Sequence, residues 1–401
     1  MKDRKKPAIR FKGFTEDWEQ RKLGDIADRV VRKNINNEST LPLTISAQYG
    51  LIDQVTYFNN RVASRDVSNY YLVLNGEFAY NKSTSDGFPY GAVKRLDLYR
   101  KGVLSTLYIV FSIKNKKKTN SDFLTFFFDT DRWHKGVYER AAEGARNHGL
   151  LNISADDFFD IDLSLPKSEQ EQAVIGAYFK QLDNLITLHQ RKYDKLVNVK
   201  KSMLEKMFPK NGESIPDIRF SGFTEDWEQR KLGELALFNP KDELPQIFEY
   251  VDLESVVGTE MLSHRTEIKS SAPSRAQRIA RTGDLFYQTV RPYQKNNYLF
   301  EKPDNNYVFS TGYAQMRPFV DGYFMLSLVQ SERFIKVVLD NCTGTSYPAI
   351  NSNNLAEIEV HAPSNKKEDN KIGTIFRNID NLITLHQRKL EKLKNIKKSC
   401  L

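Results

Sequence analysis

The chain has 401 residues, 40% of them hydrophobic and 12% aromatic, which suffices for two or more folded domains and excludes a disordered protein. Its net charge of +9 and sequence pI of about 9.1 favour a polyanionic partner, with nucleic acid the first candidate. No stretch approaches the ~18–20 apolar residues of a membrane span. Two cysteines, Cys342 and Cys400, are too few for a disulfide framework or a CxxC metal site and fit a reducing cytoplasm.

One motif is written twice. The segment GFTEDWEQRKLG occupies residues 13–24 and occurs again, letter for letter, at residues 222–233. The match extends outward to residues 9–27 and 218–236. We interpret the repeated leader as a docking segment.

A second pair of matching segments lies towards the end of the two copies. Residues 182–204 read LDNLITLHQRKYDKLVNVKKSML, and residues 379–401 read IDNLITLHQRKLEKLKNIKKSCL. Fainter echoes lie between leader and closing segment, which indicates one duplicated unit with small deletions in its second copy. Drift after duplication is the alternative explanation, but it would not easily leave the ends so uniform and the centres so different. We therefore expect both halves to share one fold and their central regions to have different functions.

Each centre mixes strand and helix signals. Runs such as YLVLNGEFAY and GDLFYQTV are β-branched or aromatic and are bounded by turn residues, whereas SDFLTFFFDTDRWHKGVYER and YFMLSLVQSERFIKVVLDN favour helices. The predicted fold class is α+β, with two pseudo-repeated globules of mixed α and β structure, separated and joined by two long coiled-coil helices.

The two long helices are predicted from capping and periodicity. Ser168 and Glu171 form a capping box, and Asn365 and Glu368 hold the matching positions in the second copy. Apolar residues then recur every three and four positions, and we pair the two helices antiparallel because neither can bury its stripe alone. The predicted seam comprises Ile175, Leu182, Leu185, His189, Leu196, Ile379, Leu382, His386 and Leu393.

Two histidines, His189 and His386, occupy equivalent seam positions. We interpret them as polar seam residues that fix register and partner choice. A metal site or a proton relay is the alternative interpretation.

The sequence lacks recognisable catalytic motifs. No G-x-G-x-x-G follows a strand, and we find no Walker A loop, no HExxH and no Asn-Pro-Pro tetrapeptide of the kind that amino-methyltransferases carry. A nuclease-like pattern, Pro216-Asp217 followed by EQRK, has arginine where lysine is wanted, so we interpret it as linker and docking segment. We predict no catalytic residue and no metal site in this chain.

This organisation resembles one family closely. Two divergent globules, each followed by a near-identical helix, and the repeated leader GF…WE.RKLG resemble the specificity (S) subunit of type I restriction-modification systems. The resemblance covers essentially the whole chain and is most specific in the leaders and in LPKSEQEQAVIGAYFKQLDNLI at residues 165–186. It implies that each globule is a target recognition domain reading one half of a bipartite, asymmetric site in double-stranded DNA, and that the helices set the half-site spacing.

The resemblance also implies partners. Two modification (methyltransferase) subunits would dock on the helices and leaders, bind S-adenosylmethionine and methylate adenine. Two restriction (motor and nuclease) subunits would hydrolyse ATP, translocate and cleave, with Mg also expected in partner subunits. The chain itself is expected to be a non-catalytic subunit without a cofactor, acting in host defence in a bacterial cytoplasm and not at a membrane.

The DNA-facing residues are predicted from position and side-chain type. Polar and basic residues that follow a strand, where the copies diverge, are the types that reach base edges or hold phosphate. Ordinary surface loops are the alternative. In copy one we nominate Lys82, Ser83, Thr84, Tyr90, Arg146, Asn147 and His148. In copy two we nominate Gln288, Thr289, Arg291, Tyr293, Gln294, Lys295, Thr345, Ser346 and Tyr347.

The predicted domains are leader 1–27, recognition domain 28–166, central helix 167–208, linker and leader 209–236, recognition domain 237–363 and C-terminal helix 364–401. Copy one continues beyond its helix as EKMFPKNGESIP, whereas copy two stops at Leu401, so we expect its helix to lack about one turn. A standalone tandem DNA-binding regulator and a protein-interaction scaffold remain alternatives. An enzyme with its catalytic site in the globules is disfavoured.

Overall fold

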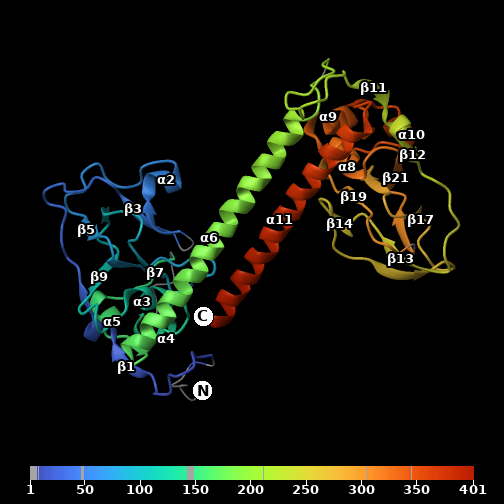
Figure 1. Ribbon diagram of the computed structural model, residues 1–401. Helices are drawn as coiled ribbons and strands as arrows, with labels where there is room; N and C mark the ends of the chain where they lie inside the picture. Colours follow the sequence, from blue (N-terminus) through green and yellow to red (C-terminus); the bar gives the residue numbers. More distant parts are fainter. Residues whose placement is uncertain are drawn as a thin grey trace. The chain divides into compact units, whose positions relative to one another are not determined.

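The structure is a computed structural model that describes residues 7, 9–46, 49–141, 149–210, 212–304, 306–344 and 346–401. It contains two compact units: unit 1 is Met1–Leu188 with Leu390–Leu401, and unit 2 is His189–Lys389. The division crosses both long helices, so each unit holds one globule and a segment of each helix (Figure 1). Within the described ranges, no helix combines the length and apolar character needed to cross a membrane.

Unit 1 runs from the leader into the first long helix and also contains Leu390–Leu401 at the end of the second. Its elements are β1 (Glu19–Lys22), α1 (Leu23–Ile26), β2 (Ala27–Arg29), β3 (Leu43–Ser46), β4 (Gly50–Asp53), α2 (Gln54–Phe58), β5 (Tyr71–Leu74), β6 (Phe78–Asn81), β7 (Ala92–Arg95), β8 (Lys101–Leu104), β9 (Ile109–Ile113), α3 (Ser121–Phe127), α4 (His134–Arg140), α5 (Ala155–Phe159), β10 (Asp162–Leu165) and the first half of α6 (Glu169–Lys206).

Unit 2 repeats this order with additional strands. Its elements are β11 (Glu228–Lys231), α7 (Leu232–Leu235), β12 (Ala236–Phe238), β13 (Ile247–Val251), β14 (Val256–Val257), β15 (Glu260–Met261), β16 (Arg265–Ile268), β17 (Ala276–Ile279), β18 (Leu285–Gln288), the 3-10 helix η1 (Pro292–Gln294), β19 (Tyr298–Leu299), β20 (Tyr307–Ser310), β21 (Tyr313–Pro318), α8 (Gly322–Gln330), α9 (Glu332–Asp340), α10 (Ser352–Ala356), β22 (Glu359–Ala362) and most of α11 (Lys366–Cys400).

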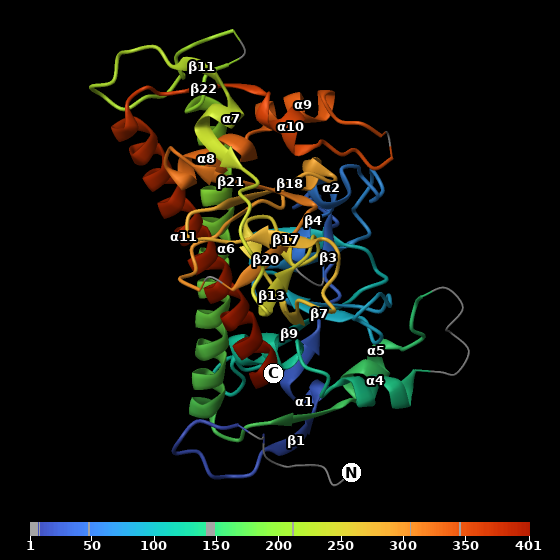
Figure 2. The same ribbon diagram turned by 90° about the vertical axis from the view of Figure 1, so that its right-hand side faces the viewer.

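Both units share the same central sheet. Its strand order is β2-β9-β6-β7 in unit 1 and β12-β21-β18-β19 in unit 2. In each unit the leader strand also pairs antiparallel with the strand before the long helix, β1 with β10 and β11 with β22 (Figure 2). The α+β class and the pseudo-repeat predicted from the sequence are therefore confirmed.

The units differ in their second layer of strands. Unit 2 has a four-stranded sheet of order β16-β13-β20-β17, in which β13 and β20 run parallel. Unit 1 has instead two separate antiparallel pairs, β3 with β4 and β5 with β8. The structural divergence between the copies thus lies in the centres, where the two sequences also diverge.

Each core fills the space between the central sheet and the short helices. In unit 1, Phe78 of β6 and Phe111 of β9 stack at 5.2 Å between ring centroids, and both are fully buried. In unit 2 a further core lies between the central sheet and the second sheet, where Phe286 of β18 and Phe309 of β20 stack at 3.6 Å between ring centroids. Aromatic rings bury a large apolar area per residue, which stabilises a small domain.

The long helices run antiparallel in both units. In unit 1, Lys397 of α11 forms an ion pair with Asp183 of α6 at 2.7 Å. In unit 2, Lys200 of α6 pairs with Asp380 of α11 at 2.6 Å. The residue numbers rise along α6 as they fall along α11, so the antiparallel prediction is confirmed.

At two positions the helix seam differs in register from the prediction. Leu185 and Leu382 are 36% and 44% exposed, whereas their neighbours Ile186 and Ile383 are partly buried. Along α6 the less exposed positions run through Phe179, Leu182, Ile186, His189, Tyr193 and Leu196. Of the other predicted seam residues, Ile379 is buried and Ile175, His386 and Leu393 are partly buried.

The helix entry also differs from the predicted capping box. The Ser168 hydroxyl accepts the backbone N–H of Glu171 at 3.2 Å, as expected. The Glu171 carboxylate, however, accepts both Nε and Nη2 of Arg10, at 2.6 and 2.7 Å, and so binds the leader. In unit 2 the Glu368 carboxylate accepts the same two donors from Arg219.

The two seam histidines contact each other directly in unit 2. Their Nδ1 atoms lie 2.7 Å apart, so one ring donates and the other must offer a lone pair. Burial and the facing His189 hold the pKa of His386 below its ordinary value. A proton on each ring would break this contact and place two positive charges together.

The histidine pair predicts a pH dependence. Because the pKa of His386 is lower in the folded than in the unfolded chain, its contribution to stability is present above the unfolded pKa of about 6.5 and is lost as the pH falls below it. We expect the free energy of unfolding to fall more steeply between pH 7.5 and 5.5 in the wild type than in His386→Gln, measured by urea titration. His264→Gln, which removes an imidazole elsewhere in unit 2, is the control. Equal slopes in the wild type and His386→Gln would contradict this prediction.

Candidate functional site

Two loops of unit 2 meet beyond β18. We call residues 289–297 loop 2a and the described residues 343–344 and 346–350 loop 2b. The Arg291 N–H donates to the Pro348 carbonyl at 2.8 Å, and the Ile350 N–H donates to the Thr289 carbonyl at 3.0 Å. A β-bridge between Val290 and Ala349 completes this pairing. Segments far apart in the sequence, both of them nominated above, are thus held together through backbone groups.

Loop 2a has an unusual backbone. Arg291 and Lys295, which flank η1, have φ angles of 54° and 56°, in the left-handed region. Residues with side chains seldom adopt this conformation, and where it persists it tends to be at ligand-binding positions. The loop conformation therefore supports a functional assignment independently of its composition.

The exposed side chains of these loops form a mixed cationic and aromatic surface. The guanidinium of Arg291 lies 4.5 Å from the centre of the Tyr347 ring. Tyr347 is 65% exposed and Tyr293 is 49% exposed, and Gln294 and Ser346 are also exposed. Arginine and glutamine can hydrogen-bond base edges, and hydroxyl groups commonly contact phosphate. This surface can therefore bind a nucleic acid.

Three nominated residues of unit 2 are occupied inside the protein. Gln288 and Thr289 are only 2% and 7% exposed. The Gln288 amide donates to the Val290 carbonyl, and the Thr289 hydroxyl donates to the Gly312 carbonyl. Lys295 pairs with Glu332 at 2.9 Å. These contacts hold the shape of loop 2a, and the nomination of Gln288 and Thr289 as DNA-contacting residues stays a prediction.

Unit 1 has the same arrangement of loops. Loop 1a (residues 82–91) follows β6, and loop 1b (residues 149–153) precedes α5. Ser83 forms a β-bridge with Leu150, and the Thr84 N–H donates to the Gly149 carbonyl at 2.6 Å. The ammonium group of Lys82 donates to the Ile153 carbonyl at 3.4 Å, so this lysine supports the loop pairing.

An aromatic group beside loop 1a was missed by the sequence interpretation. The Tyr90 ring lies 4.9 Å from His134 and 6.4 Å from Tyr138, both on α4. Tyr138 is 58% exposed, and burial lowers the pKa of His134. The only available signal was an exposed tyrosine on a short helix, which is too common on protein surfaces to mark a site.

Some nominated residues cannot be placed. Arg146, Asn147, His148 and Thr345 lie outside the described residues, and their role stays a prediction. Among the residues that are described, no group of three or more His, Cys, Asp or Glu side chains has the geometry to hold a metal ion. The contact of His189 with His386 is thus a pair without further ligands of these types in the described part of the chain.

Comparison with known proteins gives a consistent result. The family model for the type I restriction modification DNA specificity domain matches residues 15–198 and 269–395. The chain is 23% identical over 409 residues to the type I restriction enzyme MjaVIII specificity subunit of Methanocaldococcus jannaschii, covering 96% of this chain and 91% of that protein.

Two further relatives extend the comparison. The HindI specificity subunit of Haemophilus influenzae is 24% identical over 185 residues, 43% of this chain and 39% of that protein. The crystal structure of the S subunit of a type I restriction-modification system from M. genitalium has a TM-score of 0.55 at 14% identity. It covers 96% of this chain and 95% of that one. At this identity the structural likeness shows the fold.

Loop 2a generates a binding prediction. If the Arg291 guanidinium reads a base edge, Arg291→Ala should weaken binding of duplexes that the wild-type chain selects from a random library by about 1–3 kcal/mol. Fluorescence anisotropy measures the affinity. Arg281→Ala is the matched control, because Arg281 is also in unit 2 but is paired with Asp242. Unchanged affinity and unchanged selected sequence in Arg291→Ala would remove it from the interface.

Proposed function

The chain belongs to the family of type I restriction modification DNA specificity domains, and from this premise we propose that it directs partner subunits to a bipartite, asymmetric site in double-stranded DNA. Loops 1a and 1b read one half-site, and loops 2a and 2b read the other. The observation that carries this proposal is the equivalence of the loop pairs: the same backbone bridge recurs in both units with different side chains.

The composition of the two loop pairs supports different targets. Loops 2a and 2b expose Tyr293 and Tyr347 beside a partly buried Arg291, whereas loop 1a presents Ser83 and Thr84 beside Tyr90. Base edges in the major groove differ in their donors, acceptors and methyl groups, so different side chains select different bases. Two loop pairs with the same backbone pairing but different side chains therefore suit a DNA site whose two halves differ in sequence.

The helices offer a docking surface in each unit. Leu185 and Leu188 of α6 are 36% and 46% exposed, and Leu382 and Leu385 of α11 are 44% and 45% exposed. Each pair is three residues apart, on one helix face, within a segment of identical sequence DNLITLHQRK. Exposed leucines on charged helices mark interaction surfaces. We assign one pair to each of two modification subunits.

The proposed division of labour follows from the family. Modification subunits bind S-adenosylmethionine and methylate adenine, and restriction subunits use ATP and Mg to translocate and cleave, in a bacterial cytoplasm. The present chain supplies DNA recognition and assembly. The alternatives, a standalone tandem regulator and a scaffold, differ in one respect: neither needs two copies of a methyltransferase.

A globule exchange tests the bipartite reading. Residues 28–160 are replaced by the centre of another family member, and modified adenines are mapped by single-molecule sequencing in cells that also make the partner subunits. We expect one half of the methylated motif to change, because residues 237–357 and both helices are untouched. The other half and the spacer should stay the same.

The reciprocal exchange of residues 237–357 is the matched control and should change only the other half. An exchange that alters both halves, or leaves both intact, favours the regulator or the scaffold.

The leucine pairs generate a prediction about stoichiometry. Leu185→Asp with Leu188→Asp should release one modification subunit, and adding Leu382→Asp with Leu385→Asp should release both, because a buried carboxylate is costly at an interface. Native mass spectrometry of the co-purified complex counts the copies.

Asn198→Asp, at an exposed position of α6, adds a charge away from these pairs and should leave two copies bound. Thermal melting of each variant checks folding, which we expect to be preserved because the four leucines are exposed. A single modification subunit in the wild-type complex would refute the assignment.

A further inference from the structure

The globule of unit 2 contains arginines that its carboxylates do not neutralise. Six of the nine arginines between residues 212 and 363 form ion pairs with an acidic side chain: Arg219, Arg230, Arg265, Arg281, Arg317 and Arg333. The other three, Arg275, Arg278 and Arg291, have no carboxylate partner among the residues that the structure describes. Their positive charges are therefore available to an anionic ligand.

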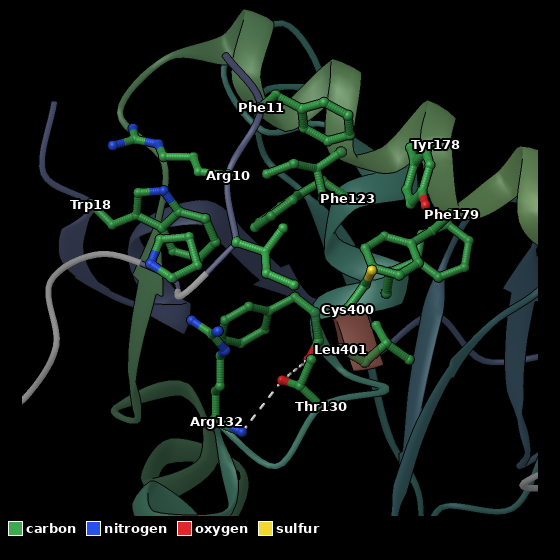
Figure 3. Close-up of a pocket in the computed structure, with 15 residues that line it drawn as sticks. Arg10, Phe11, Trp18, Phe123, Thr130, Arg132, Tyr178, Phe179, Cys400 and Leu401 are labelled. Carbon is green, nitrogen blue, oxygen red and sulfur yellow. Dashed lines mark hydrogen bonds between the residues drawn. The ribbon is translucent and has the colours of Figure 1, made fainter. Parts of the chain in front are cut away.

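Two of these three arginines also lack an aromatic contact. Unit 1 shows the usual situation beside an apolar cavity of about 220 Å³ (Figure 3). There Arg10 is bound by a carboxylate of α6, and Arg132 lies 5.4 Å from the centre of the Trp18 ring. Arg275 and Arg278 have neither kind of contact with a described residue, so their N–H donors stay free to bind a ligand.

Hydrogen bonds place Arg275 next to loop 2a. Arg275 immediately precedes β17, which pairs with β20 (Figure 2). Its carbonyl accepts the N–H of Thr311 at 2.8 Å, in the turn between β20 and β21. The carbonyl of the next residue, Gly312, accepts both the N–H and the hydroxyl of Thr289, at 2.9 and 2.8 Å. Because loop 2a begins at Thr289, these bonds connect Arg275 to the loop that carries Arg291.

The second layer of strands contacts loop 2a at another point. The Gly258 N–H, in the turn between β14 and β15, donates to the side chain of Asn296 in loop 2a at 2.8 Å. Leu253 precedes this turn, and a Cβ atom at Gly312 would lie 2.9 Å from its side chain. Loop 2a and the two turns are therefore in mutual contact, which fixes the place of Arg275 relative to the loop.

The charges around β17 favour an anion. The side chain of Arg275 is exposed, and three residues further on the Nε atom of Arg278 is buried without a hydrogen-bond partner. Burial holds the pKa of Arg278 below its ordinary value, because a desolvated charge without a partner is costly. Asp252, whose carbonyl lies 3.3 Å from the Tyr313 hydroxyl after the β20–β21 turn, is already paired with Arg265. An approaching anion would offset the cost of the two unpaired charges.

Unit 1 has other residues at the equivalent positions. Its strand β5 pairs with β8 as β17 pairs with β20. Tyr71 of β5 holds the repeat position of Arg278. Ser68 holds the repeat position of Arg275. The two unpaired arginines of β17 are thus a feature of one copy only, in the region where the copies diverge.

We propose that Arg275 binds a phosphate group of the DNA backbone, beside the bases that loop 2a reads. This inference rests on the proposed function and adds a contact that positions the duplex without reading its sequence. Double-stranded DNA carries one negative charge per ~1.7 Å of its axis, so a duplex bound by loop 2a presents phosphates to the neighbouring surface. Arginine can bind a phosphate through two parallel N–H donors, and the charge of Arg278 adds to the attraction.

The salt dependence of DNA binding tests this contact. The wild-type chain and Arg275→Ala are compared on the duplex that the wild type selects from a random library, between 50 and 200 mM salt. We expect the slope of log K against log salt concentration to be less negative by about 1 in Arg275→Ala, because one phosphate fewer is neutralised. Across this range the variant should lose about three- to fourfold less affinity than the wild type. A selection repeated with Arg275→Ala should return the same sequence.

Three further variants make the result specific. Arg275→Gln keeps most of the side-chain length but not the charge and should show the same slope as Arg275→Ala. Arg275→Lys keeps the charge and should retain the wild-type slope. Arg281→Ala is the matched control just beyond the other end of β17, and it should also retain that slope because Arg281 is paired with Asp242. Thermal melting checks folding, which we expect to be preserved because Arg275 is exposed.

The outcomes separate this inference from the proposed function. A wild-type slope in both Arg275→Ala and Arg275→Gln, or a changed selected sequence, would overturn the phosphate contact and leave the proposed function intact. A wild-type chain that selects no sequence at all would contradict the proposed function, and the phosphate contact with it.

Discussion

The conserved frame of each unit depends on one buried ion pair. Both carboxylate oxygens of Glu171 accept hydrogen bonds from Arg10, and Glu368 and Arg219 form the same bidentate pair. Both glutamates are 1% exposed, and a charge buried to this degree is tolerated only when it is fully paired. The pair joins the leader to the first turn of the long helix. Loss of either partner would leave an unpaired buried charge, which is a physical reason for both copies to keep the pair.

A close backbone approach completes this frame. A Cβ atom at Gly176 would lie 2.7 Å from the backbone nitrogen of Phe123, and one at Gly373 would lie 2.9 Å from that of Phe324. Only glycine allows α3 and α8 to begin against the long helices at this distance. The long helix, the leader and the short helix therefore make the same close contacts in both units.

The sequence predicted the large features because the duplication displays them twice. The prediction failed where the sequence pattern alone is compatible with more than one arrangement of the side chains. In LDNLITLH both Leu185 and Ile186 are apolar, so two heptad registers fit, and only packing decides that Ile186 faces the seam. Gln288 and Thr289 look like surface polar residues, yet they are buried because they satisfy loop carbonyls. The Arg10–Glu171 pair spans 161 residues and leaves no local pattern at all.

The loops that differ between the units are held mainly by backbone groups. Arg291 binds Pro348, and Thr84 binds Gly149, through N–H and carbonyl groups that every residue except proline supplies as a pair. Side chains on these loops can therefore change without loss of the contacts that position them. A frame that depends on specific side chains cannot vary in this way. The frame is held by specific side chains, whereas the loops are held by backbone hydrogen bonds. This difference is the physical reason that one repeated fold can carry two different recognition surfaces.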